Sequence, residues 1–220
     1  MVSLARAAFA ANWLVTSRLL RSGGWVGTQE LAEVGRPRFL TTVVRLPPDL
    51  TAQLVGLAAP LVELQPEHYL YPAESVHMTI LALADARGVE DEIRAVAERH
   101  HAFTVEIGGL NVSRRTVFAE IYPEDQGLAS LRRELGAVAG AHAPRWRRTP
   151  RWLAHATVVR FARSIDSGLL NEVGERRKAQ LGRFTVTEFE LVHADKVLSL
   201  GGTRSLARFR LGAGMLPGAR

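Results

Sequence analysis

The chain contains no cysteine, which excludes disulfide bonds, thiol nucleophiles and cysteine-ligated metal ions. Lysine is nearly absent as well: Lys178 and Lys196 are two of the 28 lysine and arginine residues, so the other 26 are arginine. No apolar stretch reaches the roughly 18 residues that a membrane-spanning helix needs. These absences argue against a disulfide scaffold, a thiol enzyme and a helical membrane protein.

What the chain does contain is typical of one globular enzyme domain. Its 220 residues are enough to bury a substantial core, and 47% of them are hydrophobic. The formal net charge of +6 predicts an anionic partner, such as a nucleotide or RNA. A strong preference for arginine over lysine can also reflect the base composition of a genome, so the charge alone defines no binding site. We expect a cytoplasmic monomer that needs no cofactor.

Two short segments repeat the pattern His-x-Thr-hydrophobic. The sequence reads HMTI from His77 and HATV from His155, and both segments lie in apolar runs typical of β-strands. Side chains two residues apart share one face of a strand. Each copy therefore presents one imidazole and one hydroxyl, from Thr79 or Thr157, on the same side.

Such a pair of motifs suits acid and base catalysis at phosphorus. In-line attack needs a base on the nucleophile and an acid on the leaving oxygen, and histidine titrates near neutral pH. A hydroxyl beside each imidazole can donate to the non-bridging phosphate oxygens. This scheme requires no metal ion.

The alternative is that both histidines are structural. A single histidine in an apolar strand is more often a hydrogen-bonded core residue than a catalyst, but two copies of one pattern favour function. Zinc binding fits less well, because the chain has no cysteine, no His-x-His pair and no carboxylate at short ligand spacing from His77 or His155.

The segments around both motifs resemble the 2H phosphoesterase superfamily, most closely its 2′-5′ RNA ligase-like branch, over residues 39–211. The first motif has the leader PAESV from Pro72, and the second continues as HATVVR to Arg160. The resemblance implies two pseudo-symmetric lobes whose antiparallel sheets face a central cleft, with the helices outside. It also implies that the catalytic residues are His77, Thr79, His155 and Thr157.

Two groups of residues are candidates for substrate binding. The resemblance assigns Arg160 to the phosphate, but strict strand alternation turns Arg160 away from the face of His155. A basic, aromatic loop before the second motif can bind phosphates and stack on a base, or it can be a solvated surface loop. Its candidate residues are Arg145, Arg147, Arg148, Arg151 and Trp152.

The remaining patterns predict an α+β fold with strands interleaved with helices and hairpins. Expected strands cover residues 39–46, 76–84, 103–110, 115–122, 152–161, 184–198 and 205–211, the last two as a closing hairpin. Expected helices cover residues 3–21, 50–64, 89–101, 128–139 and 165–181. We therefore divide the chain into an N-terminal helical extension (1–38), a two-lobed 2H phosphoesterase-like domain (39–212) and a tail (213–220).

Three functions are compatible with these features. The first is a metal-independent phosphodiesterase that acts on RNA ends or small nucleotides, opening a 2′,3′-cyclic phosphate to a 2′-phosphate, with reversible 2′-5′ RNA ligation as the reverse chemistry. The second is a hydrolase of 2′-5′ oligonucleotides or another small phosphodiester. The third is a non-catalytic RNA-binding module, which the two intact motifs disfavour.

Overall fold

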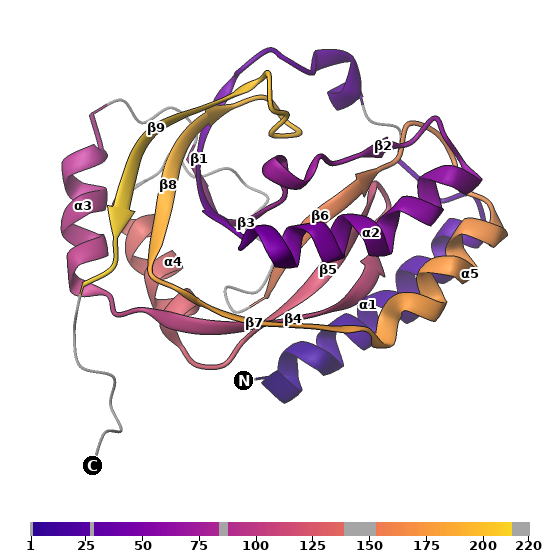
Figure 1. Cartoon of the computed structure of the whole chain (residues 1–220), viewed down its shortest axis with the longest axis horizontal. Helices are drawn as coiled ribbons and strands as arrows, with labels where there is room; N and C mark the ends of the chain where they lie inside the picture. Colours follow the sequence, from indigo (N-terminus) through magenta and orange to yellow (C-terminus); the bar gives the residue numbers. More distant parts are fainter. Residues whose placement is uncertain (1, 27–28, 84–87, 139–152, 213–220) are drawn as a thin grey trace.

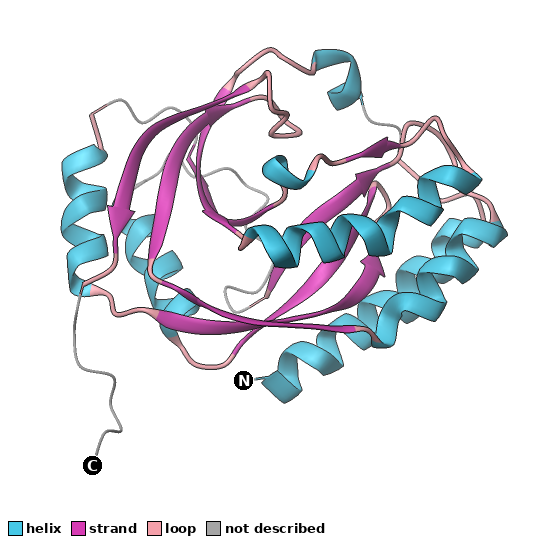
Figure 2. Ribbon diagram, in the orientation of Figure 1, coloured by secondary structure: helices cyan, strands magenta, loops and turns pink. Residues whose placement is uncertain are grey.

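The computed structural model describes residues 2–26, 29–83, 88–138 and 153–212, and helices pack around one antiparallel sheet (Figure 1, Figure 2). The strand order is β7-β4-β5-β6-β3-β1-β8-β9, and β2 pairs with β6 outside this path. The expected α+β class is confirmed. The strands of the two expected lobes meet at β3 and β6, which hydrogen-bond to each other and join both halves into a single sheet.

The helices of the described residues are α1 (Val2–Arg21), α2 (Pro48–Leu64), α3 (Glu90–Arg99), α4 (Gly127–Val138) and α5 (Ser167–Glu175). The strands are β1 (Phe39–Arg45), β2 (Tyr69–Leu70), β3 (His77–Leu83), β4 (Phe103–Val112), β5 (Thr116–Pro123), β6 (Ala154–Arg160), β7 (Gln180–Val186), β8 (Glu188–Ala194) and β9 (Thr203–Arg210). The hairpin of β8 and β9 forms as expected.

Four of these helices cover one face of the sheet. Figure 1 shows α2 and α5 side by side over one half of it and α3 and α4 over the other half. Met78 and Ile80 of β3 and Ala156 of β6 point into the core that these helices cover, together with Leu54 of α2 and Leu131 of α4. The residues between them on each strand point to the opposite face. We call that opposite face the motif face, because it carries the histidines and threonines of both motifs.

The segment from residue 165 to 198 differs from the expected helix and long strand. Helix α5 ends at Glu175, a 3₁₀ turn follows at Arg176–Lys178, and β7 begins at Gln180. Residues 176–181 are good helix formers, but the hydrogen bonds of β7 to β4 override that local preference. The expected strand also divides between β7 and β8, which lie at distant positions in the sheet.

Helix α1 packs on the motif face of β4 and β5. Phe9 lies 6.0 Å from Phe118 of β5 between ring centroids, and Asn12 donates to the carbonyl of Val112 at 2.8 Å. The Asn111 amide donates to the carbonyl of Phe9 at 3.0 Å. The expected N-terminal helix is thus held against the sheet by apolar and polar contacts, one strand away from β6.

Candidate active site

The two motifs lie on neighbouring antiparallel strands. Met78 of β3 pairs with Ala156 of β6, so antiparallel counting places His77 opposite Thr157 and Thr79 opposite His155. The four side chains therefore form a rectangle on the motif face, with the imidazoles on one diagonal and the hydroxyls on the other. Diagonal neighbours on adjacent strands are separated by about 7–8 Å, which leaves room for a phosphate between the two rings.

His77 is buried, with 6% of its surface exposed, and its orientation is fixed by the backbone before it. Its Nδ1 lies 2.7 Å from the Ser75 carbonyl, which can only accept, so Nδ1 carries a proton and donates. Nε2 is then the nitrogen left for chemistry. Burial lowers the pKa of His77 to about 4, against the opposing effect of the Ser75 carbonyl and with smaller contributions from Arg45, His155 and Arg160.

His155 is exposed on the motif face and packs beside Phe118, with 5.1 Å between ring centroids. Desolvation by the surrounding protein, followed by the charge of Arg132, lowers the pKa of His155 to about 4. Because solvent reaches this ring, the direction of the shift matters more than its size. Both imidazoles are therefore neutral at pH 7 before a substrate binds.

Arg160 lies on the motif face despite the five residues that separate it from His155. Phe118 pairs with Thr157 and Val117 with Val159, so Val158 is an extra residue in β6 and forms a β-bulge. The bulge shifts the alternation by one residue. The Nε of Arg160 donates to the hydroxyl of Tyr71 at 3.2 Å, and its charge contributes to the lowered pKa of His77. The bulge therefore places Arg160 on the face of His155, which strict strand alternation did not predict.

Two further arginines near the motifs were not identified from sequence. Arg45 pairs with His77 across β1 and β3 and donates to the Glu74 carbonyl at 3.3 Å. Arg132 of α4 donates to backbone carbonyls of both motif strands, at Thr79, Ile80 and Leu153. The sequence did contain a sign that Arg132 has a special role. It lies four residues after Leu128, on the apolar face of the helix, where a charged residue is unusual.

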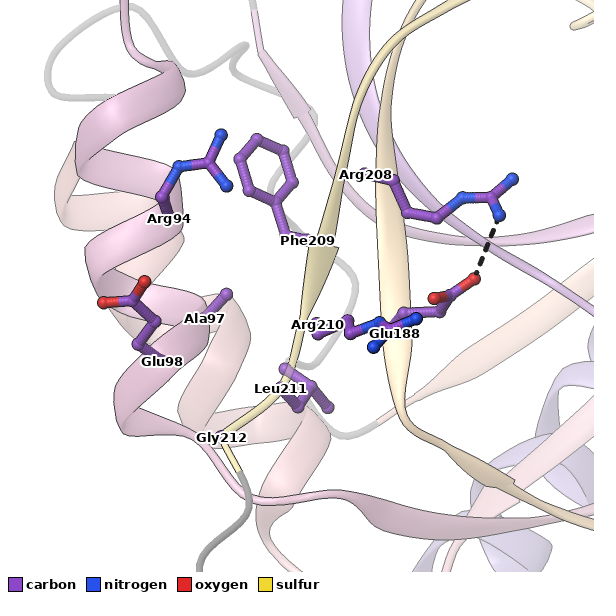
Figure 3. A pocket seen from close by; sticks show the side chains of 9 residues that line it. All are labelled: Arg94, Ala97, Glu98, Glu188, Arg208, Phe209, Arg210, Leu211 and Gly212. Carbon is purple, nitrogen blue, oxygen red and sulfur yellow. Dashed lines mark ion pairs between the residues drawn. The ribbon is translucent and has the colours of Figure 1, made fainter.

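The basic loop residues Arg145, Arg147, Arg148, Arg151 and Trp152 lie outside the described residues. A cavity of about 520 Å³ lies between α3 and β9, away from both motifs (Figure 3). Arginine and glutamate side chains line this cavity together with Phe209, at Arg94, Glu98, Glu188, Arg208 and Arg210 (Figure 3).

Within the described ranges, no group of three or more histidine or carboxylate side chains is arranged to hold a metal ion. None of the helices that the structure describes is long and apolar enough to cross a membrane.

Comparison with protein-family models finds the family that the two motifs resemble. The model of the 2′-5′ RNA ligase superfamily matches residues 32–198. Comparison with curated proteins found no match.

Solved structures share the fold at low sequence identity. TT0787 of Thermus thermophilus is 20% identical with a TM-score of 0.59, and the match covers 80% of this chain and 100% of that one. E. coli LigT, solved with NADP+, is 21% identical with a TM-score of 0.59, covering 80% and 99%. A conserved protein of unknown function from Agrobacterium tumefaciens, ATU0111, is 13% identical with a TM-score of 0.56, covering 86% and 96%.

Proposed function

Because the chain belongs to the 2′-5′ RNA ligase superfamily of 2H phosphoesterases, we propose that it is a metal-independent phosphodiesterase acting on RNA ends or small nucleotides. In this proposal it opens a 2′,3′-cyclic phosphate to a 2′-phosphate. The observation that carries the proposal is the diagonal placement of two imidazoles and two hydroxyls on neighbouring strands. An acid and a base on opposite sides of one phosphorus atom are what in-line displacement needs.

The surroundings of the two rings favour different roles. The Ser75 carbonyl accepts from His77 and stabilises its protonated form, which an acid needs. The charge of Arg132 favours the neutral form of His155, which a base needs. We assign His155 as the base and His77 as the acid.

The reaction then follows from these positions. His155 accepts a proton from water while the water oxygen bonds to phosphorus. The bond from phosphorus to the 3′ oxygen breaks, and His77 donates a proton to that oxygen, giving a 2′-phosphate and a 3′-hydroxyl. Thr79 and Thr157 donate to the non-bridging oxygens, where negative charge increases in the transition state. Ligation follows the same sequence with an RNA 5′-hydroxyl in place of water: its oxygen bonds to phosphorus, the bond to the 3′ oxygen breaks, and a 2′-5′ phosphodiester with a free 3′-hydroxyl results.

Charge on the motif face supports an anionic substrate. Arg45 and Arg160 both lie close enough to His77 to lower its pKa, so a phosphate between the rings would meet positive charge. E. coli LigT has been crystallised with phosphate, with 3′-AMP and with ATP, which supports the nucleotide class. Arginines of the basic loop would extend the site toward longer RNA.

The test is a product assay on 2′,3′-cyclic AMP with and without EDTA. We expect 2′-AMP, no effect of EDTA, and losses of about 10²–10⁴-fold for His77→Ala and for His155→Ala. Thr79→Ala and Thr157→Ala should cost less, because each removes one hydrogen bond to the phosphate. Formation of 3′-AMP, or inhibition by EDTA that a divalent ion reverses, would contradict the proposed chemistry.

A further inference from the structure

Arg132 lies where the ladder between the two motif strands stops. Strands β3 and β6 pair at Met78 and Ala156, and antiparallel counting would next bring Ile80 to Ala154 and Leu81 to Leu153. Instead, the guanidinium of Arg132 enters at this level from α4. Its Nε donates to the Ile80 carbonyl at 2.8 Å, and its Nη2 donates to the Thr79 carbonyl at 2.8 Å.

The third contact reaches the other strand. Nη1 of Arg132 donates to the carbonyl of Leu153, the residue directly before β6. One planar group therefore joins the backbone of β3 to the backbone that leads into β6. This joint lies beside the pair of Thr79 and His155, because the Thr79 carbonyl is one of its acceptors and Leu153 is two residues from His155.

We infer that Arg132 is a positioning residue that fixes the spacing of the two motif strands, so that His155 and Thr79 face the same phosphate. The inference rests on the proposed function for its catalytic consequence. A rigid fork with donors in fixed directions can hold three carbonyls in one plane, whereas a lysine amine on a flexible stem cannot. Displacements of about 1 Å in a catalytic group can cost about 10²-fold in rate.

The charge of Arg132 has a second consequence for the same ring. Burial lowers the pKa of Arg132 to about 10, which still leaves the guanidinium charged at neutral pH. This fixed positive charge acts on His155 and disfavours its protonated form. Spacing and charge can be separated experimentally, because lysine keeps the charge and glutamine removes it.

The experiment compares Arg132→Lys and Arg132→Gln with Arg133→Gln in the full chain. Arg133 is the next residue of the same helix, is exposed and donates to Ser130 Oγ at 2.7 Å, so its variant is the matched control. The measurements are kcat and KM on 2′,3′-cyclic AMP, the NMR titration of His155 and the melting temperature. The His155 signal is assigned by its loss in His155→Ala.

We expect kcat to fall about 10²-fold in both Arg132 variants, with a smaller change in KM, and to stay at the parent value in Arg133→Gln. The His155 midpoint should stay low in Arg132→Lys and rise in Arg132→Gln. Parental kcat in Arg132→Lys would overturn the positioning role. So would a loss of kcat that is matched by a large loss of melting temperature, because the residue would then serve the fold as a whole.

Failure of the proposed function would look different. If the parent chain does not turn over cyclic nucleotides, the same variants are titrated with inorganic phosphate while the His155 signal is followed. Weaker phosphate binding in both Arg132 variants, with a raised His155 midpoint in Arg132→Gln, would uphold the inference, and unchanged values would refute it. If Arg132→Gln does not fold, the outcome for Arg132→Lys decides.

Discussion

The pH dependence of kcat/KM tests the electrostatic environment of the two histidines. The pKa values of His77 and His155 are both lowered to about 4 in the free enzyme, chiefly by desolvation. Productive enzyme needs a neutral His155 and a protonated His77. With the pKa of the buried His77 near 4, the protonated acid makes up about 9% of the enzyme at pH 5 and about 0.1% at pH 7. These fractions predict a fall in kcat/KM of up to about 90-fold between these pH values.

The assay measures initial rates on 2′,3′-cyclic AMP from pH 4 to pH 8 at constant ionic strength. The cyclic phosphate keeps its single negative charge over this range, so the profile reports the enzyme. The profile of kcat should lie at higher pH than that of kcat/KM, because a bound phosphate favours the imidazolium form. A plateau of kcat/KM between pH 5 and pH 7, or a rise with a midpoint near 6.5, would refute the reasoning.

A charge variant gives the profile an internal control. Arg45→Gln removes one of the charges that lower the pKa of His77, so its kcat/KM should decline at higher pH than in the parent. Arg38→Gln removes an arginine with 51% of its side chain exposed and paired with Glu33, and should leave the profile unchanged. Equal shifts in both variants would indicate a general effect of net charge.

Two further outcomes follow from the fold. Arg160→Gln should raise KM for cyclic AMP with little change in melting temperature, whereas Arg163→Gln, an exposed neighbour, should change neither. If Arg160→Gln has the same KM as the parent, Arg160 does not belong to the phosphate site. Phe9→Ala should destabilise the protein by about 3–5 kcal/mol in urea unfolding, because Phe9 is only 5% exposed between Phe118 and Tyr122, and a loss below about 1 kcal/mol would contradict this packing.

The sequence was informative where local pattern and tertiary structure agree. The motif strands, the N-terminal helix and the closing hairpin all follow from apolar periodicity, and the structure has them within a few residues of the expected bounds. The α+β class followed from their alternation. Periodicity was misleading at residues 176–181, where helix formers lead into the edge strand β7, because strand pairing is a long-range property that local preference does not contain.

The candidate site also combines features that local sequence predicts with features that depend on long-range contacts. The i and i+2 spacing was enough to group each histidine with its threonine, because that relation is local. Arg160 needed a bulge at Val158, and a bulge depends on how two strands pair. Arg45 and Arg132 come from β1 and α4, far from both motifs in sequence, so only the folded chain brings them to the motif strands.

Helix α1, which precedes the family match, has a consequence for the charge state near His155. Glu120 pairs with His155 across β5 and β6, and burial raises the pKa of the Glu120 carboxyl. Asn111 donates to that carboxyl at 2.6 Å and to the carbonyl of Phe9 in α1, so the helix helps to exclude water from it. Trimming the chain to its family boundaries would remove the helix that covers Glu120 and expose this carboxyl to water. The shortened protein would retain both motifs and yet have a different polar environment at the residue that pairs with His155.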